Sequence, residues 1–218
     1  MNEKIYAKKL IQYGSAAIAA LFLIGFFWLS FYRVGYEMDL YSLVQFRQRL
    51  WQGFTMTLIM SAASLVLSVF IGAAAAMAQK SKVLIFSYLA KMYVQMIRGT
   101  PLLVQIYLFF YIIGTAWGVD NRYVIGAVIL SIFEGAYISE IIRGGLESID
   151  SRQFEIARAI GLSKAKTTRL VTYPILMSRI LPALAGQFAS IIKDSSLLSV
   201  VAVSELTKTT QEISAQNF

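Results

Sequence analysis

The 218-residue sequence contains no cysteine and no histidine. The chain can therefore form no disulfide, use no thiol or imidazole in catalysis, and build no zinc site from cysteine and histidine. Charged residues are also scarce, at 15%, whereas 57% of the residues are hydrophobic and the mean hydropathy is +0.63. This composition excludes an ordinary soluble domain and predicts a protein that crosses a membrane several times.

The sequence also lacks the phosphate loop G-x-x-x-x-G-K-[ST], so we do not expect it to bind ATP in the usual way. Its net charge is +8. In a membrane protein, such a basic excess usually marks loops that face the cytoplasm and its anionic lipids. We therefore expect a lipid surface, and no nucleic acid, as the partner of these charges.

Apolar stretches predict an all-α membrane protein, a polytopic helical bundle of about five transmembrane helices. The predicted spans are residues 11–32, 52–78, 102–113, 123–143 and 175–203. A signal peptide has a shorter apolar core than the first run, which we interpret as a retained helix. Residues 35–49 mix apolar and charged side chains, which predicts either an amphipathic segment on the outer face or an ordinary loop.

We divide the chain into residues 1–50, an N-terminal transmembrane helix with the outer segment, and residues 51–218, a transmembrane domain. Small side chains in the second span favour close helix packing in lipid. Residues 83–118 are too long for one straight span. Gly99-Thr-Pro101 should break this region into a tilted helix and the third span.

Residues 150–174, here called the basic knob, are the longest polar interval between apolar segments. Asp150 can cap a short helix, and Gln153 completes a capping-box pattern. Gly161 suits the left-handed position just past that helix. Phe154, Ala157 and Ile160 share one face of it.

A second short helix can follow Ser163, and its face carries Leu170 and Tyr173. It should stop near Tyr173, because helical geometry is disfavoured before Pro174. A helix–glycine–helix with basic residues also suits a DNA-binding helix-turn-helix. Flanking membrane spans instead place the basic knob at a membrane surface, where basic residues are expected on the cytoplasmic side.

With Met1 in the cytoplasm, the predicted spans also place Lys80, Lys82 and the basic knob inside the cell, in line with the positive-inside rule. Residues 115–122 then form a short outer turn. The N-terminus is thus predicted to be cytoplasmic, and the chain to end outside.

Ionisable residues within the predicted spans are candidates for function, because charge is costly in a membrane. Glu134 and Glu140 lie in the fourth span, and the fifth contains Lys193-Asp194-Ser195-Ser196. Each acid can face a transport pathway or a structural partner. Lys193 and Asp194 can also neutralise each other where an interrupted helix crosses the bilayer.

Four segments resemble motifs of the permeases of ATP-binding-cassette (ABC) importers, in that family's order. Glu155-Ile-Ala157, followed by Gly161 and Pro174, is similar to the EAA loop, with isoleucine in place of the usual central alanine. Residues 98–105, 134–143 and 193–200 resemble signatures of the polar amino-acid branch, the histidine/glutamine/arginine type. Glu134 stands where asparagine is usual, a departure that could change which substrate is favoured.

The resemblance covers residues 52–218 and implies a type I ABC importer permease, which is not itself an enzyme. Its EAA loop would be a coupling helix that docks on a separate ATPase subunit, where ATP and Mg are bound. Implied partners are a second permease subunit, as homodimer or heterodimer, an ABC ATPase dimer and an external amino-acid-binding protein. The implied location is the cytoplasmic (inner) membrane. Related permeases usually continue beyond this point into one more apolar helix, which the sequence lacks.

The resemblance also implies roles for two groups of residues. The residues implied in ATPase coupling are Gln153, Glu155, Ala157, Arg158, Gly161 and Leu162. The candidates for the substrate pathway are Arg98, Gln105, Glu134, Tyr137, Glu140, Lys193, Asp194, Ser195 and Ser196. Acidic candidates outnumber basic ones in the spans, which favours a cationic or neutral amino acid.

Two other functions fit part of the pattern. An ATP-independent secondary transporter or channel would also have acids and broken helices in its spans, but it has no need for the basic knob. A non-transporting membrane scaffold is the other alternative.

Overall fold

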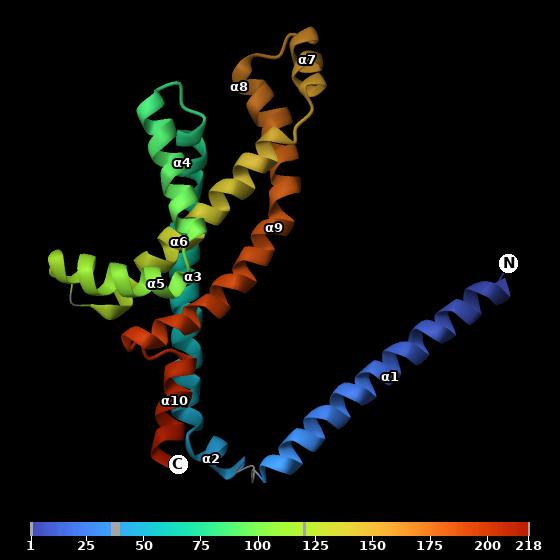
Figure 1. The fold of residues 1–218 in the computed structure, drawn as a ribbon. Coiled ribbons are helices and arrows are strands. Elements are labelled where there is room, and N and C mark those ends of the chain that lie inside the picture. Colours follow the sequence, from blue (N-terminus) through green and yellow to red (C-terminus); the bar gives the residue numbers. More distant parts are fainter. Residues whose placement is uncertain (1, 36–39, 120, 218) are drawn as a thin grey trace. The chain divides into compact units, whose positions relative to one another are not determined.

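The computed structural model describes residues 2–35, 40–119 and 121–217 of the chain (Figure 1). Within these ranges the chain forms helices and turns and no strand, which confirms the predicted all-α class. It divides into two compact units, Met1–Gln45 and Phe46–Phe218. The sequence placed this boundary after residue 50, whereas the first helix of the second unit already begins at Arg47.

The first unit contains α1 (Asn2–Val34) and α2 (Leu40–Gln45). α1 includes a candidate membrane span, Ile11–Val34. No residue in its most apolar stretch is buried. Large side chains such as Trp28 are exposed, as lipid contact requires. α2 is a short helix inside the segment predicted to be amphipathic or a loop, of which residues 36–39 lie outside the described part of the chain.

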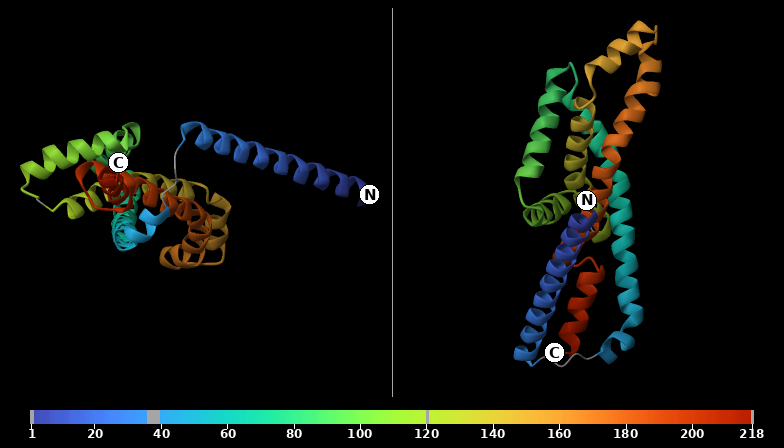
Figure 2. Two further views of the ribbon diagram at one scale, coloured as in Figure 1. Left: turned by 90° about the horizontal axis from the view of Figure 1, so that it is seen from below. Right: turned by 90° about the vertical axis from the view of Figure 1, so that its right-hand side faces the viewer.

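The second unit is a run of helices, several of which are continuous with their neighbours. In chain order they are α3 (Arg47–Gln79), α4 (Leu84–Gly99), α5 (Leu102–Tyr107), the π-helical η1 (Leu108–Gly114), α6 (Arg122–Glu147), α7 (Ser151–Ala159), α8 (Lys164–Thr167), the π-helical η2 (Thr168–Thr172), α9 (Tyr173–Asp194), the 3-10 helix η3 (Ser195–Val201) and α10 (Leu206–Asn217). The loop after α3 and the basic knob lie at the same end of this unit, and α10 lies at the other (Figures 1 and 2). This arrangement agrees with the prediction that Lys80 and Lys82 share a membrane side with the basic knob.

Four helices in the described ranges are long and apolar enough to cross a membrane. They are Ile11–Val34, Arg47–Gln79, Arg122–Glu147 and Lys164–Val201. The pair Leu84–Gly99 and Leu102–Gly114, bent by 113°, adds a fifth if it forms one broken span. The predicted number of about five spans is therefore confirmed.

α3 and α6 form the centre of the second unit, because small side chains let their backbones approach closely. Thr57, Ser61, Ser64 and Ser68 recur every three or four residues along α3 and are buried. Further along α3, a Cβ atom added to Gly72 would come within 2.9 Å of the Gly135 carbonyl oxygen of α6. The predicted close packing of this span is thus confirmed.

The break between α4 and α5 falls at Gly99-Thr-Pro101, as predicted. The side chain of Gln105 bridges this break. Its Nε2 donates to the Ile97 carbonyl oxygen at 2.7 Å and to Thr100 Oγ1 at 2.7 Å. Gln105 therefore satisfies groups that lack helical partners at the end of α4.

The prediction that the second helix of the basic knob ends near Tyr173 is wrong. α8, η2 and α9 form one continuous helical stretch, and Pro174 lies in the first turn of α9. Proline lacks the N–H group of a regular helix and clashes with the carbonyl four residues earlier. The wider π-turn of η2 directly before it accommodates this defect without ending the helix.

The fifth span changes from α-helix to 3-10 helix at the predicted polar cluster, where α9 passes directly into η3. After η3 the chain turns at Ala202, a non-glycine residue with φ of 59°, and enters α10, which the sequence analysis did not predict. Buried Glu205 caps α10 by accepting the backbone N–H groups of Thr207 and Lys208 at 2.8 and 2.7 Å. α10 then packs on α3, where Arg49 pairs with Glu212 at 3.1 Å.

Candidate functional site

Local backbone signals build the basic knob as the sequence predicts. The side chain of Asp150 accepts the backbone N–H of Arg152 at 2.9 Å and caps α7. Gly161 has φ of 76°, and the N–H of Leu162 reaches back to the Ala157 carbonyl at 2.9 Å. These contacts form a Schellman ending, in which a left-handed glycine turns the chain sharply after the helix.

The next helix begins where predicted. Ser163 Oγ accepts the backbone N–H of Lys166 at 3.4 Å and caps α8. The turn between α7 and α8 is therefore fixed from both sides, by a C-terminal motif and an N-terminal cap. The knob is consequently a defined protrusion.

The knob presents apolar side chains outward. Of the face shared by Phe154, Ala157 and Ile160, only Ala157 is fully buried, whereas Ile160 is 68% exposed. Leu170 and Tyr173, on the following helix, are also exposed. No other described residue of the chain covers these side chains.

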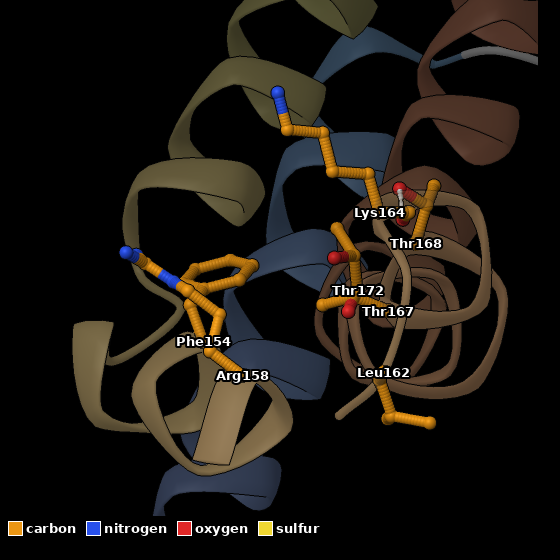
Figure 3. Close-up of a pocket in the computed structure, with 7 residues that line it drawn as sticks. All are labelled: Phe154, Arg158, Leu162, Lys164, Thr167, Thr168 and Thr172. Atoms are coloured by element: carbon orange, nitrogen blue, oxygen red, sulfur yellow. Dashed lines mark hydrogen bonds between the residues drawn. The ribbon is translucent and has the colours of Figure 1, made fainter. Parts of the chain in front are cut away.

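A hollow of about 500 Å³ opens between α7 and the helix that follows it. Figure 3 shows Phe154 and Arg158 on one side and Lys164 on the other. Its remaining lining residues are Leu162, Thr167, Thr168 and Thr172. Arg158 and Lys164 form no ion pair within the described ranges, so the hollow keeps its positive charge.

Two contacts join the base of the knob to the spans on either side of it. Arg179 of α9 donates a hydrogen bond to the Ser148 carbonyl oxygen at the end of α6. One turn earlier, a Cβ atom on Gly145 would come 2.9 Å from Leu176 Cδ1 and still closer to Ile180. α6 and α9 are therefore in direct contact just below the knob.

A charge network lies on α4 and α6, toward the knob end of the unit. Glu140 accepts hydrogen bonds from Arg143 at 2.8 and 3.0 Å and pairs with Arg98 of α4 at 3.4 Å. Arg98 also stacks over the Tyr137 ring, 5.3 Å from its centroid. Arg143 additionally bonds Glu147 at 2.7 Å. Three predicted pathway residues thus form a structural link between two helices.

The network also reaches α3. Gln79 Nε2 donates to Ser139 Oγ at 2.9 Å and to Glu140 Oε1 at 3.3 Å. An open hollow of about 530 Å³ beside these groups is lined further by Lys80, Lys91 and Gln95. The sequence analysis did not name Gln79 or Arg143 as candidate site residues, although each is a polar residue near the end of an apolar span.

A second polar group lies deeper, where α6 meets α9. The Glu134 side chain is fully buried, and Gln187 of α9 donates a hydrogen bond to its Oε2 atom. Its Oε1 atom accepts no N–H or hydroxyl donor among the described residues. Asp194 lies close enough to Glu134 for a hydrogen bond between the two carboxyl groups. Two predicted acids are thus brought together, along with an amide that the sequence analysis missed.

The remaining predicted residues of the fifth span do not join this group. Lys193 is exposed and forms no ion pair within the described ranges, so it does not neutralise Asp194. The hydroxyls of Ser195 and Ser196 donate to the carbonyl oxygens of Ile192 and Lys193, at 2.8 and 2.6 Å. These hydroxyls therefore satisfy their own helix.

Residues 68–218 match a family described as "Binding-protein-dependent transport system inner membrane component". The probable glutamine ABC transporter permease protein GlnP of Bacillus subtilis is 39% identical over 77% of each chain. The glutamine transport system permease protein GlnP of Escherichia coli K12 is 38% identical over 77% of each chain. The nopaline transport system permease protein NocM of Agrobacterium fabrum is 33% identical, over 81% of this chain and 77% of its own.

Two solved structures are also similar. A crystal structure of an amino acid ABC transporter with histidines superposes with a TM-score of 0.75 and 32% identity, over 83% of this chain and 84% of that chain. An inward-facing structure of the MetNI methionine ABC transporter superposes with a TM-score of 0.59 and 15% identity, over 80% and 82%. The second likeness concerns the fold alone.

Proposed function

Because the chain belongs to the family of binding-protein-dependent transport system inner membrane components, we propose that it is the permease subunit of an importer for a polar or cationic amino acid. Its membership confirms the resemblance expected from the four motifs. The substrate class is supported by the similarity to glutamine and nopaline permeases and to an amino acid transporter of known structure.

The basic knob carries this proposal. It is a capped, rigid protrusion with exposed apolar side chains and unpaired basic residues in the described part of the chain, which suits a protein partner. Residues 2–217 include no phosphate loop, so nucleotide, with Mg, would be bound by that partner. We assign the knob as the docking site of an ABC ATPase subunit. The protein would lie in the cytoplasmic (inner) membrane, with the knob and the N-terminus on the cytoplasmic side.

The contacts at the base of the knob suggest how a conformational change of the partner is transmitted to the membrane spans. Closure of an ATPase dimer would move the knobs of two permease subunits as rigid bodies. α6 and α9 would follow, because Gly145 and Arg179 fasten them together below the knob. The pathway would then alternate between outward and inward openings, and an external binding protein would deliver the substrate.

Two substitutions in the knob test this coupling. Glu155→Lys changes an exposed charge on α7. Gly161→Val strains the left-handed turn, although no atom lies within 4 Å of its Cβ position. Both should abolish ATP-driven uptake and co-purification with the ATPase, while membrane insertion stays normal.

Matched controls distinguish a loss of ATPase docking from a general loss of folding. Gly161→Asn should retain uptake, because asparagine tolerates left-handed geometry. Gln211→Lys places a new charge on the exposed side of α10 and should also transport normally. Normal uptake by both Glu155→Lys and Gly161→Val would refute the coupling role and favour an ATP-independent transporter.

A further inference from the structure

A basic hollow lies where the end of α3, one face of α4 and the end of α6 meet. Its volume of about 530 Å³ is within the range of ligand sites in proteins. The charged side chains that line it are four basic ones and two acidic ones, namely Lys80, Lys91, Arg98, Arg143, Glu140 and Glu147. The basic hollow therefore has an excess of positive charge.

The acids of the basic hollow neutralise its arginines and leave its lysines unpaired. Glu140 pairs with Arg98 at 3.4 Å and with Arg143 at 2.8 Å. The second acid also bonds Arg143, at 2.7 Å. Lys80 and Lys91 form no ion pair with any residue that the structure describes. The excess positive charge therefore resides on the two lysines, which are available to an anion from outside the described chain.

α4 presents further donor groups to the same hollow. Lys91, Gln95 and Arg98 are spaced four and three residues apart, so they lie along one face of the helix. The side-chain amide of Gln95 has two N–H groups. The ring of Tyr88 lies 5.9 Å from Lys91 Nζ and attracts the ammonium group without neutralising it. An anion in the basic hollow would thus meet ammonium groups from the end of α3 and from α4.

The basic hollow lies at the knob end of the second unit (Figure 1). Lys80 directly follows α3, and Glu147 is the last residue of α6, shortly before the basic knob. Lys91 lies two turns after Leu84, the first residue of α4, about 10 Å along the helix. The headgroup layer of a bilayer is roughly 5–8 Å thick on each side, and lysine side chains extend toward it. With the knob in the cytoplasm, the basic hollow lies at the cytoplasmic headgroup layer.

Apolar side chains border the basic hollow on α4. Met92 and Met96 follow Lys91 and Gln95 by one position, and they are 64% and 59% exposed. The acyl chains of a phospholipid would cover this border, whereas a soluble anion would leave it bare. Basic pockets between membrane helices on the cytoplasmic side are also typical sites for acidic lipid headgroups. These observations favour a lipid phosphate over a free one.

We propose that the basic hollow binds the phosphate of an anionic phospholipid, with Lys80 and Lys91 as its charged partners. The oxygen atoms of a phosphodiester only accept hydrogen bonds and share a negative charge, which suits the three N–H donors of each ammonium group. The bound lipid would link the end of α3 to α4. This inference rests on the cytoplasmic placement of the knob in the proposed function and adds a ligand to that function.

Lipid titration of the purified permease–ATPase complex in detergent tests the site. Phosphatidylglycerol and phosphatidylcholine with the same acyl chains are the probes, and native mass spectrometry counts the bound lipid. The wild-type complex should bind phosphatidylglycerol at least about tenfold more tightly than phosphatidylcholine. Lys80→Gln and Lys91→Gln should each weaken phosphatidylglycerol binding about fivefold, the factor expected when one lysine is removed from an anionic lipid surface.

Lys82→Gln is the matched control. It removes the same charge from the loop after α3, but Lys82 does not line the basic hollow, so lipid binding should be unchanged. A loss as large as that of Lys80→Gln would indicate general attraction to the surface and overturn the inference. Equal binding of the two lipids by the wild-type complex would also overturn it, even if both lysine variants failed to assemble.

Two further measurements separate the remaining outcomes. An excess of inorganic phosphate should leave phosphatidylglycerol bound, and its displacement would show that the hollow takes a soluble anion instead. ATP-driven amino-acid uptake by the same preparation tests the proposed function independently. Retained uptake without a lipid preference would refute this site alone, whereas no uptake of any amino acid would refute the importer function and leave the lipid result standing.

Discussion

A methyl group added at Gly72 tests how closely α3 and α6 approach. Its Cβ atom would lie 2.6 Å from Ile138 Cγ2 and 2.9 Å from the Gly135 carbonyl oxygen. The Ile138 methyl could rotate away, but the carbonyl belongs to the backbone of α6. The two helices must therefore separate. Overpacking of this kind costs about 1–3 kcal/mol, which is the steric contribution that we expect for Gly72→Ala.

Helix propensity acts in the opposite direction and must be measured separately. Alanine favours a helix over glycine by about 1 kcal/mol. Gly144 of α6 and Gly186 of α9 have no atom within 4 Å of the position that an alanine methyl group would occupy, so alanine there adds propensity without a clash. Gly144→Ala and Gly186→Ala should therefore be neutral or stabilising.

Thermal unfolding of the purified complex, followed by near-ultraviolet circular dichroism, provides the measurement. A change of 1 kcal/mol shifts the Tm of a chain of this size by roughly 2–4 °C. Gly72→Ala should unfold below the wild type and below both control variants. If its Tm equals or exceeds that of Gly144→Ala, the close approach of the two helices is refuted.

Three further substitutions probe the ends of helices. Asn121→Ala should cost about 1 kcal/mol, because Asn121 Oδ1 caps α6 through the N–H groups of Tyr123 and Val124 at 3.0 and 3.2 Å; amide exchange in that first turn should rise, and unchanged exchange would count against the cap. Ala202→Gly should raise the Tm by removing about 1 kcal/mol of left-handed strain, and a lower Tm would contradict this. Glu205→Gln should weaken the cap of α10 by about 1 kcal/mol, which limited proteolysis of α10 would detect; an unchanged cleavage rate would argue against the cap.

Signals within a few residues predicted the basic knob well. Asp150, Gly161 and Ser163 each act through a backbone group no more than four positions away, so their roles can be inferred without the fold. The predicted end of the second helix, just before Pro174, was wrong, because α8, η2 and α9 form one continuous helix there. The general rule that residues before proline avoid helical geometry takes no account of a π-turn. The π-turn of η2 accommodates the proline without ending the helix.

The end of the chain was predicted less well. α10 is polar, so hydropathy gives no sign of it, and the sequence analysis assigned no role to Glu205. Its role as a buried cap depends on packing against α3, where Thr57 Oγ1 accepts the backbone N–H of Leu206 at 3.1 Å. That contact joins residues far apart in sequence.

The sequence by itself determined that this protein is a bundle of membrane helices with a capped basic knob. Apolar length and local backbone geometry are properties of short segments, and they do not depend on the rest of the chain. The tertiary structure alone decided which partners the charged side chains have. Glu140 pairs with Arg98 and Arg143, and Glu134 meets Gln187 and Asp194, because those partners come from parts of the chain that meet only when the bundle folds.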